Sequence, residues 1–270
     1  MKLITIIALL ITANLFASQK LIFGAISTIE PELMKEHLSP IMKYIENATG
    51  KKVVFKTGYN YDNTIEKFAN QEFDIGYIGP APYVKAKKIN PNAINILAKV
   101  KNSKKQPFQS VIISKRGSSI SNLEDINNHS FAFGSPSSTL SYYVPMDILI
   151  RSNTIDKIKK YNFLGRHDKV AQYVIMGRYD VGAVKNSIAQ KYSKYIQVIK
   201  RSEPLSDFVM VSSSSLDPEL SKKIKNALLT LKDKKVLKSL KKSAIGFEMA
   251  NDSDYDSLRT IIKNVEAYKK

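Results

Sequence analysis

The chain has 270 residues and a formal net charge of +18, and it contains three histidines and no cysteine. The missing cysteines exclude disulfides, thiolate chemistry and lipid attachment at a cysteine. The length is enough for two modest domains or one large one.

The first 18 residues have the layout of a secretory signal peptide. Lys2 precedes an uncharged, mostly apolar stretch over residues 3–16, and the small residues Ala17 and Ser18 follow. This stretch is shorter than the roughly 20 residues that span a membrane, so an uncleaved anchor is the weaker alternative. We expect residues 1–18 to be removed after Ala17 or Ser18, and the mature chain to be exported.

Strand and helix patterns then alternate along the chain. The expected strands cover residues 20–27, 51–59, 73–79, 94–100, 110–116, 130–134, 158–165, 180–184 and 195–202. The expected helices cover 31–50, 63–72, about 138–152, a segment from Asp168 that this residue caps, a segment from Pro218, and 254–270. Such an order predicts an α/β fold with mostly parallel sheets flanked by helices.

The helix expected from Pro218 explains much of the basic charge. Leu220, Ile224, Leu228 and Leu231 recur at helical spacing, and lysines fill the opposite face. Lysines are scattered in this way over nearly every predicted helix. They therefore indicate a solvated surface that steers anions, and we expect no nucleic-acid partner.

An internal similarity and two polar segments predict two lobes. Residues 65–79 and 170–184 share an amphipathic helix followed by an aromatic residue, an aspartate and a short apolar strand, with Asp74 and Asp180 in matching places. The polar segments 101–110 and 202–207 suit two crossings between lobes. We expect lobe 1 to comprise 19–105 and 209–270, lobe 2 to comprise 109–205, and the hinges to lie at about 105–109 and 205–209. Ligands of such folds bind beyond the carboxyl ends of the strands, between lobes that can hinge.

Hydroxyl groups gather where one predicted strand passes into a helix. Gly134 ends the strand, and Ser137, Ser138 and Thr139 occupy the first helical positions. Free N–H groups and the helix dipole favour an anion there. A plain serine cap is the alternative. At the next such turn, His167 either donates a hydrogen bond to the same anion or lies in a surface loop.

Aromatic and acidic residues complete the candidates. Tyr59, Tyr61 and Tyr83 lie near strand ends, where a phenol offers a donor and a flat wall, although each also suits ordinary packing. Asp207 lies near the second crossing and either accepts a ligand proton or caps a turn. No zinc-type ligand cluster and no phosphate loop are present in the sequence, so we expect no metal and no cofactor.

A catalytic triad of Ser138, His167 and Asp207 is the enzymatic alternative. The strand-to-helix turn of serine hydrolases usually reads Gly-x-Ser-x-Gly, and the segment from Gly134 has no second glycine. Triads are defined by geometry rather than by a sequence motif, so the missing glycine weakens the enzymatic alternative without excluding it.

Four segments resemble, in the same order along the chain, the phosphonate-, phosphite- and phosphate-binding periplasmic proteins of ABC transporters. They are residues 58–83, 133–145, 165–184 and 202–207. The resemblance covers nearly the whole mature chain. It implies a two-lobed periplasmic binding protein of type II topology, which captures a phosphorus oxyanion, is not an enzyme, and delivers its ligand to a membrane permease. It further implies a periplasmic location, and we expect a monomer; a sensor subunit for a receptor or kinase is the alternative with the same fold.

The resemblance also implies roles for particular residues. Tyr61 and Tyr83 match tyrosines that line the family's binding cleft. Ser138 and Thr139 match hydroxyl residues that hold the oxyanion, His167 matches a ligand-binding histidine, and Asp207 matches an acidic residue after the Ser-x-Pro turn.

One position departs from the family's pattern. The family often continues its hydroxyl run as Ser-Thr-Ser-Gly, whereas this chain has Leu140 and then Ser141 after Thr139. Leu140 removes one donor from the expected set. Ser141 is included among the candidate ligand-binding residues, and it either replaces this donor or does not.

Overall fold

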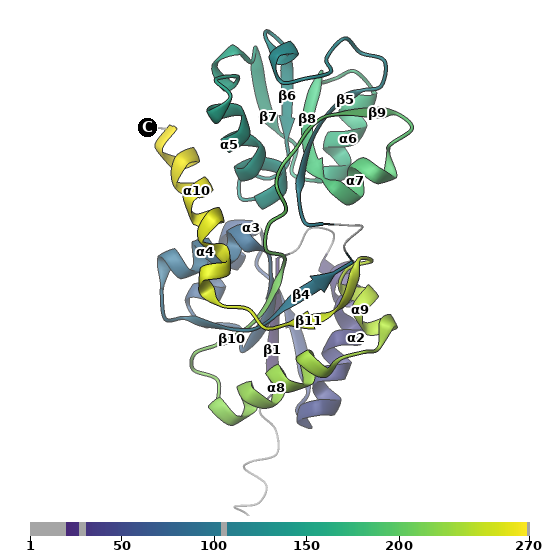
Figure 1. Cartoon of the computed structure of the whole chain (residues 1–270). Coiled ribbons are helices and arrows are strands. Elements are labelled where there is room, and N and C mark those ends of the chain that lie inside the picture. The colour runs from purple at the N-terminus through teal and green to yellow at the C-terminus, as the bar shows by residue number, and fades with distance from the viewer. Residues whose placement is uncertain (1–19, 27–30, 104–106, 269–270) are drawn as a thin grey trace, which may run out of the picture.

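The computed structural model describes residues 20–26, 31–103 and 107–268, so the expected signal peptide lies outside the described residues. Two sheets form the framework (Figure 1). The six-stranded sheet has the order β11-β4-β10-β3-β1-β2 and consists of β1 (Leu21–Ala25), β2 (Val53–Lys56), β3 (Ile75–Ile78), β4 (Ile94–Asn102), β10 (Val209–Ser213) and β11 (Ala244–Glu248). The five-stranded sheet has the order β7-β6-β8-β5-β9 and consists of β5 (Ser110–Lys115), β6 (Ser130–Phe133), β7 (Lys160–Phe163), β8 (Val181–Lys185) and β9 (Ile196–Arg201).

Helices pack around each sheet. They are α2 (Pro31–Thr49), α3 (Tyr61–Ala69), α4 (Pro80–Ile89), α8 (Pro218–Thr230) and α9 (Lys234–Leu240) around the six-stranded sheet, and α5 (Val144–Arg151), α6 (His167–Ile175) and α7 (Asn186–Lys191) around the five-stranded sheet. We call these two bodies lobe 1 and lobe 2. Among the described residues, none of the helices has the length and apolarity that crossing a bilayer requires.

The predicted α/β fold is confirmed, but the sheets are mixed rather than mostly parallel. Strands β1, β2 and β3 run parallel, and so do β6, β7 and β8. Strands β4, β5, β9 and β10 pair antiparallel with their neighbours. These four strands lead into or out of the segments that join the lobes, so the chain enters each sheet in one direction and leaves it in the other.

The two connecting segments lie side by side. The Leu205 N–H donates to the Phe108 carbonyl at 2.9 Å, and the Gln109 side chain donates to the Ser202 carbonyl at 2.9 Å. The C-terminal helix α10 (Asp256–Tyr268) makes a further connection, because it lies beside α4 at one end and beside α5 of lobe 2 at the other (Figure 1). There the Asn264 side chain donates to Asp147 at 3.2 Å.

The amphipathic helix predicted from Pro218 is confirmed as α8, with Ile224 and Leu228 fully buried. The expectation that this segment forms a single helix was incomplete. The chain turns after Leu231, the Asp233 carboxylate caps a separate helix α9, and the edge strand β11 follows. Helix α4 was also not anticipated, because Pro80 and Pro82 interrupt its sequence pattern, although prolines are compatible with a first helical turn.

The internal similarity of the sequence corresponds to a repeated hydrogen bond. The Asp74 carboxylate accepts from the Ile22 N–H at 2.7 Å, where β1 begins. The Asp180 carboxylate likewise accepts from the Ser130 N–H at 2.8 Å and from the Ser130 hydroxyl at 2.7 Å, where β6 begins. Each aspartate thus ties its own strand to the start of the neighbouring parallel strand.

Asp180→Ala should lower the free energy of unfolding by about 1 kcal/mol, because it leaves the Ser130 N–H without its partner at a half-exposed site. Burial opposes ionisation, but the hydrogen bonds from Ser130 and the nearby His129 together lower the pKa of Asp180. The stabilisation is therefore present at neutral pH and lost as the pH falls through that lowered pKa. Urea unfolding at pH 7 measures it; an equal loss in the exposed control Glu124→Ala would contradict this role.

Candidate ligand-binding site

The parallel strands of lobe 2 bring three segments to one edge of the sheet. Strand β6 is paired on its two sides with β7 and β8, so the carboxyl ends of all three lie together. The hydroxyl-rich segment around Ser138 follows β6, His167 follows β7, and Lys185 is the last residue of β8. This shared edge positions the candidate residues of lobe 2.

The hydroxyl-rich segment begins a π-helical turn, η2 (Thr139–Tyr143), instead of the expected regular helix. Gly134 makes this turn possible, because a Cβ at that position would lie 2.5 Å from the Ser141 hydroxyl oxygen. The Ser138 hydroxyl caps the turn by accepting the Ser141 N–H at 3.2 Å. The N–H groups of Thr139 and Leu140 have no partner within the helix, since they belong to its first turn.

The hydroxyls of Ser138 and Thr139 keep a proton to donate. Both side chains are buried, and both act as acceptors in the structure: Ser138 for the Ser141 N–H, and Thr139 for the Ala81 N–H at 2.9 Å. Since a hydroxyl can accept and donate at once, each can still offer its proton to an anion. The serine-cap alternative for Ser138 is thus correct, and it is compatible with binding.

Ser141 and Leu140 have internal roles. The Ser141 hydroxyl donates to the Ala183 carbonyl of β8 at 2.6 Å, so it ties η2 to the sheet and its proton is not available to a ligand in this arrangement. The Leu140 side chain is buried in the hydrophobic core, and its carbonyl accepts from the Ser110 hydroxyl at 2.7 Å. The departure from the family's hydroxyl run is therefore a core residue, and Ser141 does not act as its replacement.

His167 is held as a neutral donor. His167 is the first residue of α6, and the N-cap of this helix is Arg166, not Asp168 as expected. Asp168 lies in the first turn and pairs with Arg166 at 3.0 Å. The His167 Nδ1 accepts the Lys185 N–H at 3.1 Å. Burial, together with the nearby Lys185 charge, lowers the pKa of His167 to about 3. Its single ring proton is therefore on Nε2, where it can be donated.

Lobe 1 meets this edge through the starts of α3 and α4. Besides the bond between Thr139 and the Ala81 N–H, the Ser137 hydroxyl donates to Asp62 at 2.8 Å and accepts from the Lys85 ammonium at 3.0 Å. Burial alone would raise the pKa of Asp62, but the hydrogen bonds from Lys85 and Ser137 lower it. The hydroxyl-rich turn of lobe 2 is thus in direct contact with the strand-end face of lobe 1.

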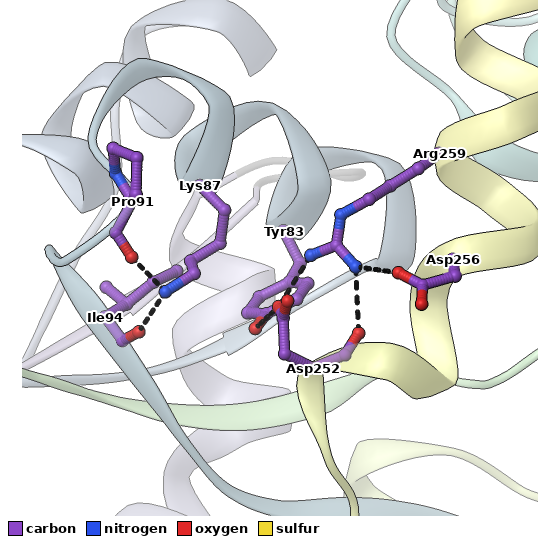
Figure 2. A network of polar contacts seen from close by, with 7 residues as sticks. All are labelled: Tyr83, Lys87, Pro91, Ile94, Asp252, Asp256 and Arg259. Carbon is purple, nitrogen blue, oxygen red and sulfur yellow. Dashed lines mark hydrogen bonds and ion pairs between the residues drawn. The ribbon is translucent and has the colours of Figure 1, made fainter.

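The hydroxyl groups of the predicted residues Tyr61 and Tyr83 differ in whether they can donate to a ligand. Tyr61 begins α3, is half-buried, and has its pKa raised to about 12 by burial, so its phenol stays protonated and can donate. The Tyr83 hydroxyl instead donates to Asp252 at 2.6 Å, and Arg259 holds the same carboxylate at 2.6 Å (Figure 2). Tyr83 is therefore a buried connection between α4 and the segment before α10, and its hydroxyl is occupied in this structure.

Asp207 is buried and fully paired. Its carboxylate accepts from the Asn102 amide and the Lys241 ammonium, and from the Phe208 N–H at 2.6 Å. A catalytic triad needs an acid that accepts from the histidine Nδ1–H, but Nδ1 of His167 is itself an acceptor and Asp207 is paired with Lys241. The geometry thus contradicts the triad of Ser138, His167 and Asp207.

Sequence reasoning missed Lys185 and Lys241, which lie near each other and near Asp207. One indication for Lys185 was present in the sequence, namely its position at the end of a predicted strand. For Lys241 there was no indication, because this residue is one of many lysines. No group of three or more acidic, histidine or cysteine side chains that could hold a metal occurs in the part of the chain that the structure describes.

Comparisons with known proteins agree with this geometry. Residues 23–255 match the family described as "ABC transporter, phosphonate, periplasmic substrate-binding protein". The chain is 22% identical over 210 residues to the "Phosphate-import protein PhnD" of Mycolicibacterium smegmatis, covering 71% of this chain and 65% of that protein. It is 23% identical over 187 residues to the "Probable ABC transporter phosphite binding protein PhnD1" of Prochlorococcus marinus, covering 66% and 62%. The chain thus matches just under two thirds of the length of these relatives.

A solved structure of Prochlorococcus marinus PhnD1 in complex with methylphosphonate has the same fold. Its TM-score is 0.79 at 22% identity, with 91% of this chain and 98% of that chain covered. Two mixed sheets joined by paired crossings define a two-lobed periplasmic binding protein of type II. The chain belongs to the family of phosphonate periplasmic substrate-binding proteins of ABC transporters, as the resemblance predicted. This family consists of binding proteins rather than enzymes.

The His167 ring should stay neutral, with its proton on Nε2, from pH 8 down to pH 5, because its pKa lies at about 3. NMR titration of the imidazole resonances measures this directly. Since three histidines are present, His37→Asn and His167→Asn variants assign the signals. A His167 signal that titrates near the ordinary value of about 6.5 would contradict the environment described above.

Proposed function

We propose that this protein binds a phosphonate, phosphite or phosphate oxyanion between its lobes and delivers it to the permease of an ABC transporter. The observation that carries the proposal is the set of protons available at one sheet edge, on Ser138, Thr139 and His167 Nε2. Family membership supports the class of ligand.

The arrangement suits a tetrahedral oxyanion for a physical reason. Removing an anion from water is costly unless most of its oxygens find donors in the protein. Hydroxyl groups, a neutral imidazole and first-turn N–H groups supply donors without fixing a full countercharge at each oxygen. The ligand is therefore held by charge-assisted hydrogen bonds and can still be released. Tyr61 is the donor that lobe 1 contributes in this proposal.

Binding between lobes would be coupled to their motion. We place the hinges at about residues 105–109 and 205–209, with lobe 1 over 19–105 and 209–270 and lobe 2 over 109–205. The paired backbone of Phe108 and Leu205 supports this placement. A ligand that contacts both lobes favours the closed form. The permease then recognises the closed form of a periplasmic monomer, exported by its signal peptide.

Isothermal titration calorimetry of residues 19–270 tests the proposal. Methylphosphonate, phosphite, phosphate and sulfate are the ligands, and calorimetry is suitable because the chain has no tryptophan to report closure. We expect one-to-one binding of at least one phosphorus oxyanion and no binding of sulfate. Absence of binding for every phosphorus oxyanion would contradict the proposed function.

Ser138→Ala and His167→Asn should each weaken binding of that oxyanion by about 1–3 kcal/mol, because each removes a hydrogen bond to a charged group. The matched controls are Ser193→Ala and His37→Asn, which change exposed residues that are not among the proposed donors. The variants should retain the wild-type circular dichroism spectrum. Wild-type affinity in both Ser138→Ala and His167→Asn would place the ligand elsewhere.

A further inference from the structure

Lys185 places a cation at the proposed site. It ends β8, and its backbone N–H holds His167 in the donor form described above. Lys185 is exposed to solvent, and the surrounding protein, together with the nearby Lys241, lowers the pKa of its ammonium. Among the described residues, its ammonium forms no hydrogen bond or ion pair. The ammonium is therefore accessible from solvent and available to an anionic group of a ligand bound beside it.

The neighbouring charges are already matched with one another. Asp207 is paired with Lys241 and Asn102, and Asp168 is paired with Arg166. His167 is neutral. Among the charged groups named here, Lys185 is thus the cation without a paired carboxylate. A carboxylate that could receive a ligand ammonium is not free here, because the oxygens of Asp207 have protein donors.

We propose that Lys185 is a specificity-determining residue that contacts the substituent of the bound phosphonate and selects substituents carrying an anionic group over those carrying an ammonium group. The inference rests on the proposed function, since it places the phosphonate group at Ser138, Thr139 and His167. The chemical class of ligand it assigns is a phosphonate, or phosphate ester, with a second acidic group. Lys241 lies near Lys185 and adds to the same field, although its own charge is shared with Asp207.

Charge and position support this assignment together. The backbone N–H of Lys185 is hydrogen-bonded to the ring of His167. The Lys185 side chain therefore begins directly beside the imidazole that is proposed to face the oxyanion. Strand β8 also lies next to β6, which leads to the Ser138 turn. A lysine side chain is long and flexible, and its point charge suits a carboxylate or phosphate without fixed geometry.

The test compares three ligands that share the phosphonate group: methylphosphonate, phosphonoacetate and 2-aminoethylphosphonate. Calorimetry gives their affinities for wild type, Lys185→Gln and Lys185→Glu. Lys194→Gln is the control for Lys185→Gln, because it removes one exposed lysine from the same lobe and changes the net charge by the same amount. The quantity compared is the ratio of affinities for two ligands. Because all three ligands carry the same phosphonate group, the long-range effect of the charge change on that group cancels in this ratio.

We expect wild type to bind phosphonoacetate more tightly than 2-aminoethylphosphonate. Lys185→Gln should reduce this preference by about tenfold to a hundredfold, as for loss of a charged hydrogen-bond partner, and Lys185→Glu should reverse it. The control should keep the wild-type ratio.

Two results would overturn the inference, and they are distinguishable. If methylphosphonate binds but Lys185→Glu keeps the wild-type ratio, or wild type prefers the aminophosphonate, the proposed function stands and the role of Lys185 is wrong. If wild type binds none of the three phosphonates, the proposed function for phosphonates fails and the assignment of Lys185 fails with it.

Discussion

The geometry of the site depends on one constraint, the common direction of three parallel strands in each sheet. In lobe 2, β6, β7 and β8 end at the same edge, and so the residues that follow them meet although they are distant in sequence. In lobe 1, β1, β2 and β3 are parallel in the same way, and α3 and α4 begin at their carboxyl ends. The bond between Thr139 and the Ala81 N–H shows that these two edges face each other.

The hydrogen bonds at this interface distinguish polar groups that are used within the fold from polar groups that are available to a ligand. Tyr83, Ser141 and Asp207 have polar atoms that are bound to other parts of the protein. Ser138 and His167 instead use their acceptor atoms internally, which leaves their protons for a ligand. The same hydrogen bonds that order the site therefore also determine which atoms can bind. A large surface charge differs from such a site, since it attracts anions at long range without fixing where they bind.

The sequence predicted those features that local patterns determine. Hydroxyls after Gly134, a histidine after the next strand and the buried face of α8 all follow from periodicity and from strand-to-helix turns. The repeated aspartates were visible too, although their partners Ile22 and Ser130 were not, because a hydrogen bond across 50 or more residues leaves no local pattern. The same reason explains Tyr83, whose partner Asp252 is 169 residues away. The π-helical turn depends on the fit between Gly134 and Ser141, which spacing alone does not reveal.

A crystal structure of residues 19–270 grown with methylphosphonate tests the central claim most directly. The account predicts phosphonate oxygens at about 2.6–3.0 Å from the Ser138 and Thr139 hydroxyl oxygens and from Nε2 of His167, with Nδ1 still accepting the Lys185 N–H. Methylphosphonate bound away from this edge, or a His167 ring turned so that Nε2 receives the Lys185 N–H, would contradict it.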